Sequence, residues 1–394
     1  MRPSAILFAA AMPVFGGCAT DPHLMPTPAV FKDERLDLAS TLAPELRSTR
    51  LPVFYATTRA AAPAGAPGHY ADRPGEGVTL GVADVRLGEP GWSWSELAAS
   101  DRTNTIEQER PGAVERIQEF GKAADPPGEA ERRFLAAIDA QLARTRNQEL
   151  VLYVHGYRVT FDEVAVLMGS FAHYLGHGAM VTFQWPTGQY FWNYVTDCPR
   201  AEAYIPDIER LIALAARSSA EKINVIAYSC GSPLLGAALA QLRARHPEEG
   251  RAALARRYRL GNVIFAASDV DLKTFASDYV PPILDLAEQL IVYASRNDRA
   301  LGFSTLIAGA SRLGKPDITD LSPAEVERLA ADPRFQAIDV SDVRGAHEMG
   351  GMKGHGYWYA NEWIATDVTI SLRYPIPPAQ RCLVNVPPGS RVWR

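Results

Sequence analysis

The chain contains 394 residues, of which 47% are hydrophobic and 22% charged, and its formal net charge is −5. This length can bury a large core and suits one domain with an N-terminal extension better than two equal domains. The acidic balance gives no electrostatic basis for binding nucleic acid through a broad basic surface.

The first residues have the pattern of a targeting segment. Arg2 precedes an apolar run at 5–12 that is too short to span a bilayer, and two glycines stand directly before Cys18. This arrangement resembles a bacterial lipoprotein signal. The resemblance implies that residues 1–17 are removed, that Cys18 is lipidated, and that Ala19 beside it directs the protein to the outer membrane. A periplasmic or secreted protein is the alternative.

Residues 18–45 contain several prolines and little periodicity, which predicts a tether between the lipid and the domain. We place the domain at residues 46–394. Its first two strands are expected at 51–57 and 77–87, as an antiparallel edge of the sheet. From Glu149 onward strands and helices alternate, which predicts an α/β fold: a doubly wound, mostly parallel sheet with helices on both faces.

The first motif with chemical meaning follows a buried strand at 149–154. This strand runs directly into His155-Gly156-Tyr157, where the glycine allows the next backbone N–H to turn. We assign one oxyanion donor to the N–H of Tyr157. The imidazole of His155 is expected to brace the loop by hydrogen bonds rather than to act in catalysis.

A loop with five bulky or aromatic residues occupies 186–194, between a strand that ends near Trp185 and a helix predicted at 201–216. Such side chains above the carboxyl edge of a sheet can line an acyl or aryl pocket, or they can cover core surface. The sequence leaves both interpretations open.

The most informative pentapeptide is Ala227-Tyr228-Ser229-Cys230-Gly231, between a β-branched strand at 222–226 and an apolar helix at 233–242. A serine lifted above a sheet on so tight a turn needs a strained backbone and small residues two positions before and after it. Ala227 and Gly231 meet this requirement. Ser229 is therefore the predicted nucleophile, and the N–H of Cys230 is the second oxyanion donor.

Two carboxylates compete for the role of the acid that orients the base. Asp269 follows a strand at 262–267, and Asp298 follows the next strand, at 289–294. We prefer Asp298, because Asp269 is equally well explained as the N-cap of the following helix.

The base is expected last in the chain. After a predicted strand at 335–340, the glycine-rich stretch 345–356 offers two histidines, His347 and His355. His355 directly precedes the final predicted helix, at 357–364, and is therefore held by a packed element. We choose His355 and keep His347 as the reserve.

Three cysteines remain beyond Cys18. In an oxidising periplasm one disulfide is allowed, and Cys198 with Cys382 is the pair that spares the serine turn. The thiol of Cys230 is then expected to serve packing.

Neither a metal nor a cofactor is predicted. His173 and His177 share one helical face, but no glutamate follows His173 as it does in zinc proteases. The glycine-rich stretch near the C-terminus lacks the Lys-Ser/Thr of a phosphate-binding loop.

Over roughly residues 50 to 375 the chain resembles DUF900, an esterase/lipase-like alpha/beta hydrolase family of unknown function. The matching passages are 53–59, 154–157, 183–186, Tyr194 with Asp197, 227–231, 266–271, 295–301 and 355–358. The resemblance implies a serine hydrolase with Ser229, Asp298 and His355 as its triad. The family's serine turn usually reads His-Ser-Met-Gly, whereas Tyr228 and Cys230 flank the serine here.

Together these features predict a cell-envelope enzyme that cleaves a small-molecule carboxylic ester or related acyl substrate through an acyl-enzyme intermediate. Its other expected partner is the membrane, through the lipid anchor. Thioester or amide cleavage uses the same groups and stays an alternative. A further alternative is a catalytically retired hydrolase that acts as an envelope interaction protein.

Overall fold

The computed structural model describes residues 22–36, 41–105, 108–124, 126–346, 354–374, 376–381, 383–386 and 390–393. The predicted signal peptide, the lipidation site Cys18, the reserve histidine His347 and the predicted disulfide partner Cys382 lie outside these residues.

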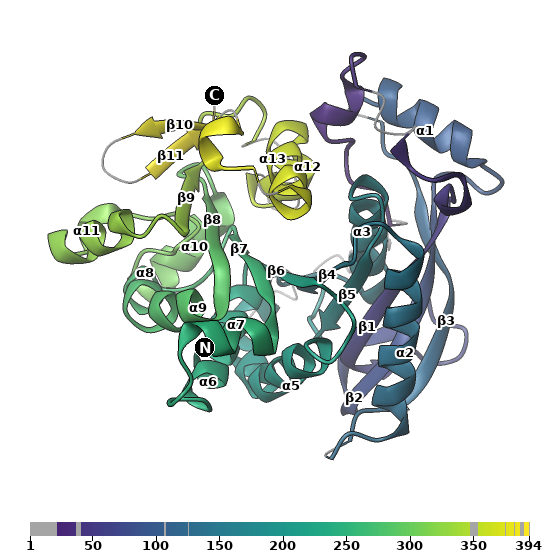
Figure 1. The fold of residues 1–394 in the computed structure, drawn as a ribbon, viewed down its shortest axis with the longest axis horizontal. Coiled ribbons are helices and arrows are strands. Elements are labelled where there is room, and N and C mark those ends of the chain that lie inside the picture. Colours follow the sequence, from purple (N-terminus) through teal and green to yellow (C-terminus); the bar gives the residue numbers. More distant parts are fainter. Residues whose placement is uncertain are drawn as a thin grey trace, which may run out of the picture.

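A single eleven-stranded sheet organises the chain, with the strand order β10-β11-β9-β8-β7-β6-β4-β5-β1-β2-β3 (Figure 1). The strands are β1 Arg50–Ala61, β2 Tyr70–Leu87, β3 Gly112–Lys122, β4 Glu149–Val154, β5 Ala179–Gln184, β6 Lys222–Tyr228, β7 Leu260–Ala266, β8 Ala287–Ala294, β9 Phe335–Asp339, β10 Leu383–Val386 and β11 Ser390–Trp393. All neighbours from β11 to β1 pair in parallel, while β10–β11, β1–β2 and β2–β3 pair antiparallel. The predicted mostly parallel sheet is confirmed.

Helices lie between the strands along the chain. They are α1 Trp94–Thr103, α2 Glu129–Arg144, α3 Phe161–Tyr174, α4 Tyr194–Arg200, α5 Ile205–Ala215, α6 Gly231–Ala244, α7 Arg251–Tyr258, α8 Leu272–Thr274, α9 Val280–Leu286, α10 Arg299–Ala308, α11 Pro323–Ala331, α12 Tyr357–Ala360 and α13 Glu362–Arg373. In the described part of the chain, no helix has the length and apolar character needed to cross a membrane.

Side chains of β4 alternate between two hydrophobic cores, as successive residues of a strand must. Leu150 and Leu152 pack in one core with residues of α2, α5 and α6. Val151 and Tyr153 pack in the other, with residues of α3 and α13. Helices therefore cover both faces of the sheet, which fixes the strand ends and the loops that follow them.

The edges of the sheet differ from the prediction. The second strand begins at Tyr70 rather than 77, and β3, β10 and β11 were not predicted. The predicted final helix at 357–364 is two helices, because Asn361 has an extended backbone and caps α13 by accepting hydrogen bonds from the N–H groups of Trp363 and Ile364.

Part of the predicted tether packs against the domain. Residues 22–36 lie beside α1 and α13, where Met25 is buried, Phe31 contacts the ring of Tyr174 and Lys32 pairs with Glu362. The prolines predicted a tether. The apolar side chains of residues 22–36 instead pack against the domain, because their free energy falls when they leave water. The described part of this segment is therefore a component of the domain.

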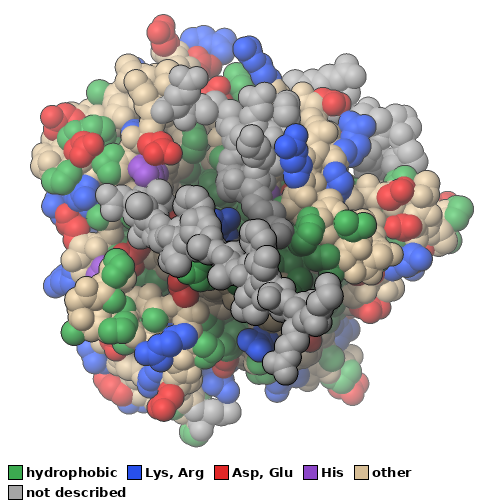
Figure 2. Space-filling view, turned by 180° about the vertical axis from the view of Figure 1, so that it is seen from behind, with side chains coloured by type: hydrophobic (Ala, Val, Ile, Leu, Met, Phe, Trp, Pro, Cys, Tyr) green, Lys and Arg blue, Asp and Glu red, His purple; other side chains and the backbone are tan. Residues whose placement is uncertain are grey.

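Charged side chains of both signs are scattered over the molecular face in Figure 2, on the parts drawn in colour. No single-sign field dominates the coloured parts of that face, in keeping with the small net charge of −5.

Candidate active site

Ser229 occupies the sharp turn between β6 and α6. Its φ is +51°, a left-handed conformation that a residue with a Cβ adopts only where the surrounding structure enforces it. Its backbone carbonyl accepts hydrogen bonds from the N–H groups of Ser232 and Asp269, and its N–H donates to the carbonyl of Ala266. The strained turn that the pentapeptide predicts is present.

The small residue after the serine is required by close packing. A Cβ on Gly231 would lie 2.4 Å from the carbonyl oxygen of His155 and 2.6 Å from that of Val154. A Cβ on Gly156 would lie 2.8 Å from the Cβ of Ser229. The loop after β4 and the serine turn therefore approach one another at distances that only glycine permits at 156 and 231.

Three side chains far apart in sequence meet at this turn. Nε2 of His355 lies 2.8 Å from Oγ of Ser229, and Nδ1 of the same ring lies 2.8 Å from Oδ2 of Asp298. All three residues are buried, and the side chain of Asp298 has no exposed surface. One continuous line of hydrogen bonds thus joins the hydroxyl to the carboxylate.

The carboxylate of Asp298 has two partners. While Oδ2 contacts His355, Oδ1 accepts a hydrogen bond from the N–H of Leu301 and so caps α10. Capping fixes the orientation of the carboxylate, and the packed helix fixes its position. The imidazole therefore receives its hydrogen-bond partner from a rigid element.

The charge of Asp298 governs the ionisation of His355. Burial of the ring disfavours the imidazolium, but the neighbouring carboxylate, its hydrogen bond and the more distant charge of Asp269 outweigh burial and raise the pKa above its ordinary 6.5.

Asp269, the competing acid, lies in the same region but does not contact His355. Its carboxylate accepts hydrogen bonds from the hydroxyls of Tyr194 and Ser304 and lies 3.4 Å from Nε of Arg312. The expected N-cap role for Asp269 is wrong, because Asp271 caps α8 instead. Asp269 thus links α4 and α10 beside the serine turn.

His155 has the bracing role expected for it. Nδ1 lies 2.7 Å from the carbonyl oxygen of Gly156, Nε2 accepts from the N–H of Trp185, and the indole of Trp185 stacks on the ring. Burial, together with the charge of Arg59, lowers its pKa to about 3. The imidazole is therefore neutral and fully engaged with the loop.

The two predicted oxyanion donors come from the elements on either side of Ser229. Cys230 directly precedes Gly231, the first residue of α6, and N–H groups at a helix start have no intrahelical acceptor. Tyr157 follows Gly156, which lies so close to the serine that an added Cβ would be 2.8 Å from the Cβ of Ser229. Their catalytic use is taken up below as a proposal.

The disulfide differs from the prediction. Cys198 bonds to Cys230, with the two Cα atoms 5.7 Å apart, rather than to Cys382. The prediction avoided Cys230 because of its place beside the nucleophile. In the structure α4 folds back over the carboxyl end of β6, which brings Cys198 within bonding distance and fastens α4 to the residue after Ser229.

Side chains of the aromatic loop are divided between the site and solvent. Tyr194 contacts the ring of Tyr157 at 5.8 Å and hydrogen-bonds to Asp269, whereas Tyr190 and Trp192 stack on each other with more than half of their surfaces exposed. Tyr194 also packs against the hydrophobic core, whereas Tyr190 and Trp192 face solvent.

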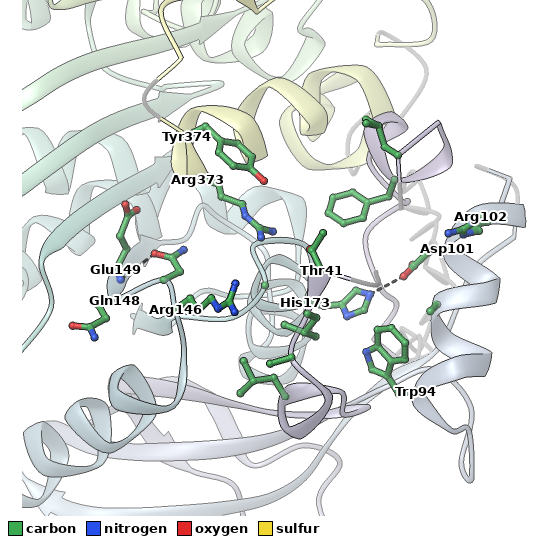
Figure 3. A pocket seen from close by; sticks show the side chains of 18 of the residues that line it. Thr41, Trp94, Asp101, Arg102, Arg146, Gln148, Glu149, His173, Arg373 and Tyr374 are labelled. Carbon is green, nitrogen blue, oxygen red and sulfur yellow. Dashed lines mark hydrogen bonds and ion pairs between the residues drawn. The ribbon is translucent and has the colours of Figure 1, made fainter. Parts of the chain in front are cut away.

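A separate cavity of about 340 Å³ lies away from these residues, at the amino ends of β4 and β6 (Figure 3). It is lined by Trp94, Arg146, His173 and Arg373, among others. His173 contacts Asp101 at 2.6 Å, while His177 lies beyond the end of α3, so the two do not share the predicted helical face. Among the described residues no group of three potential metal ligands occurs.

A mostly parallel sheet that presents a strained serine between strand and helix, with a histidine and an acid after later strands, defines an alpha/beta hydrolase. Residues 130–370 match the model of the family "Alpha/beta hydrolase of unknown function (DUF900)", and the chain belongs to this family. The family description covers a hydrolase fold and leaves the substrate unassigned.

Solved structures give a weaker likeness. A lipase-esterase related protein from Clostridium acetobutylicum ATCC 824 is 15% identical, and the match covers 50% of this chain and 76% of that chain with a TM-score of 0.24. Comparison with curated proteins finds none that matches.

Proposed function

We propose that this alpha/beta hydrolase is a serine esterase that cleaves carboxylic esters through an acyl-enzyme intermediate. The observation that carries the proposal is the hydrogen-bonded line from Ser229 through His355 to Asp298. A serine hydroxyl is a weak nucleophile unless an adjacent base takes its proton, and a third group must orient that base.

In the proposed first step Oγ of Ser229 attacks the ester carbonyl while Nε2 of His355 takes the hydroxyl proton. Asp298 accepts the hydrogen bond from Nδ1–H and stabilises the imidazolium. The C–O bond to the alcohol then breaks, and His355 returns the proton to the leaving oxygen. Water repeats the sequence on the acyl-enzyme and releases the acid.

The negative charge that develops on the carbonyl oxygen needs donors already in place. We assign them to the N–H groups of Tyr157 and Cys230, at the two elements that flank Ser229. Removing one such donor typically costs a hundredfold to a thousandfold in turnover. The Cys198–Cys230 disulfide supports this assignment, because it restrains the residue that supplies one of them.

Thioesterase or amidase activity would use the same groups, and a retired fold would keep them without turnover. The hydrogen-bonded line through all three buried side chains favours an active enzyme over a retired fold, because helix capping by Asp298 alone would not require His355 and Ser229 to be aligned with it. Ester, thioester and amide substrates that compete in one assay will distinguish these three hydrolytic activities.

The decisive experiment is labelling with a fluorophosphonate probe together with hydrolysis of p-nitrophenyl butyrate. The parent protein is expected to label, and Ser229→Ala to lose both labelling and about a millionfold in turnover, as in comparable triads. Ser277→Ala, which changes an exposed serine on another element, is the control. Equal hydrolysis by Ser229→Ala and the parent would reject the nucleophile.

We also propose that Cys18 carries a lipid that holds the enzyme at the cell envelope. The support is the sequence pattern of an apolar run followed by small residues and a cysteine. Each buried methylene of an acyl chain adds about 0.8 kcal/mol to membrane binding. A Cys18→Ser protein that fractionates with membranes as well as the parent does would contradict this.

A further inference from the structure

Six large apolar side chains are exposed together on α10, on α4 and in the loop before α4. We call them the apolar rim: Tyr190, Trp192, Val195, Phe303, Leu306 and Ile307. Leu306 is 81% exposed and Ile307 51% exposed, and with Phe303 they occupy one face of α10 at i, i+3 and i+4 spacing. Exposed apolar side chains gathered on neighbouring elements mark a place where something binds.

The two halves of the rim are fastened to each other. The ring of Tyr194 lies 6.4 Å from that of Phe303, and its hydroxyl lies 2.7 Å from Oγ of Ser304. Asp269 accepts hydrogen bonds from both hydroxyls. The rim is therefore a single surface held by a buried polar cluster.

The helices that carry the rim are fastened to the candidate active site. The carboxylate of Asp298 caps α10, and Cys198 on α4 is bonded to Cys230 beside the nucleophile. Asp269 donates its backbone N–H to the carbonyl of Ser229. Leu306 lies eight residues beyond Asp298, which is about 12 Å along a helix. Both elements that carry the rim are therefore held beside the serine turn.

The α10 part of the rim carries no charge beyond Arg299, the first residue of that helix. Residues 300–311 include no Asp, Glu, Lys or Arg. This face of α10 offers no ionic recognition, and its apolar side chains gain free energy when hydrocarbon covers them. The occupant must itself be apolar and must extend from the group that Ser229 attacks.

We infer that the apolar rim binds a long aliphatic acyl chain whose ester carbonyl lies at Ser229, so that the substrates are long-chain carboxylic esters. This inference rests on the proposed esterase function. It assigns Leu306 and Ile307 to substrate selection, although neither is near the reacting atoms in sequence. Each methylene covered by the rim raises kcat/KM up to about fourfold, which corresponds to about 0.8 kcal/mol.

The test compares kcat/KM for p-nitrophenyl butyrate, octanoate and laurate, each as dissolved monomer, in the parent, Leu306→Ser and Leu36→Ser. Leu36 is the control, because it is an exposed leucine, 42% exposed, that lines the cavity at the amino ends of β4 and β6, away from Ser229. Both substitutions remove exposed leucine side chains, so folding is expected to be unchanged, and thermal unfolding checks this.

The parent and Leu36→Ser are expected to prefer laurate over butyrate by tenfold or more. Leu306→Ser is expected to lose about three- to tenfold on laurate and less than twofold on butyrate. An equal effect of Leu306→Ser on all three esters, or no preference for long chains in the parent, would overturn the inference. Absence of Ser229-dependent butyrate hydrolysis would instead reject the esterase proposal itself.

Discussion

Asp298 holds His355 and caps α10 with the two oxygens of one carboxylate, at 2.8 Å from Nδ1 of the ring and 3.0 Å from the N–H of Leu301. The same side chain therefore stabilises a helix and orients the candidate base. These two roles require different properties of the side chain. Capping needs only a hydrogen-bond acceptor, whereas stabilising the imidazolium of His355 needs a negative charge.

Asp298→Asn separates the two duties. The amide oxygen still caps α10, so the melting temperature is expected to fall by only a few degrees, whereas turnover falls about ten-thousandfold because the imidazole loses its charged partner. Measurements of kcat and thermal unfolding check this. Asp271→Asn, at the cap of α8, is the control and should retain activity. An active Asp298→Asn protein would move the acid role to Asp269.

Activity is expected to rise with pH through a midpoint above 6.5. The neutral imidazole of His355 is the base, and its raised pKa delays deprotonation to a higher pH than for an ordinary histidine. A pH profile of kcat/KM for a short ester measures this midpoint. A midpoint below 6.5 would contradict the dominance of Asp298 over burial.

The raised pKa of His355 also predicts a pH dependence of stability. This contribution to stability falls as the pH rises, whereas activity increases. The pKa of His355 is higher in the folded protein than in the unfolded chain. Its contribution to the free energy of unfolding is therefore fully present below about pH 6.5 and is lost as the pH rises through the folded pKa. Denaturant unfolding of the parent and of His355→Gln across this range isolates the contribution. The difference in unfolding free energy between them should shrink with increasing pH, and growth would contradict the assignment.

Reduction of the Cys198–Cys230 disulfide is expected to lower both stability and activity. The bond closes a sequence separation of 32 residues, and a loop of that size contributes roughly 3 to 4 kcal/mol in the chain-entropy description. Cys198→Ser should therefore unfold earlier and hydrolyse esters more slowly, since the residue after Ser229 loses its restraint. Cys382→Ser tests the pairing expected from sequence and should resemble the parent.

Gly231→Ala is expected to disrupt the serine turn. The added methyl would overlap the carbonyl oxygens of Val154 and His155, and such overpacking costs roughly 1–3 kcal/mol. Thermal unfolding and ester hydrolysis should both decline. Gly250→Ala is the matched control, because a Cβ there meets nothing within 4 Å. Equal melting temperatures for the two variants would show that the turn relaxes without cost.

Local pattern was enough to predict the serine turn and the parallel strands around it. The run at 222–226 and the small residues at 227 and 231 specify a strand, a strained turn and a helix within about twenty residues. The unpredicted strand β3 pairs with β2 through two register shifts, which interrupt the alternation of apolar and polar residues. The alternation of apolar and polar residues in β3 was therefore too weak to predict a strand.

Sequence by itself determined the chemistry available to this protein, because the residue types and their order at strand ends allow few reactions besides acyl transfer. Tertiary structure decided which candidates meet. Asp298 reaches His355 while Asp269 is engaged by Tyr194 and Ser304, and Cys198 reaches Cys230. Distances between residues so far apart in the chain depend on how helices pack on both faces of the sheet, and local sequence does not encode that packing.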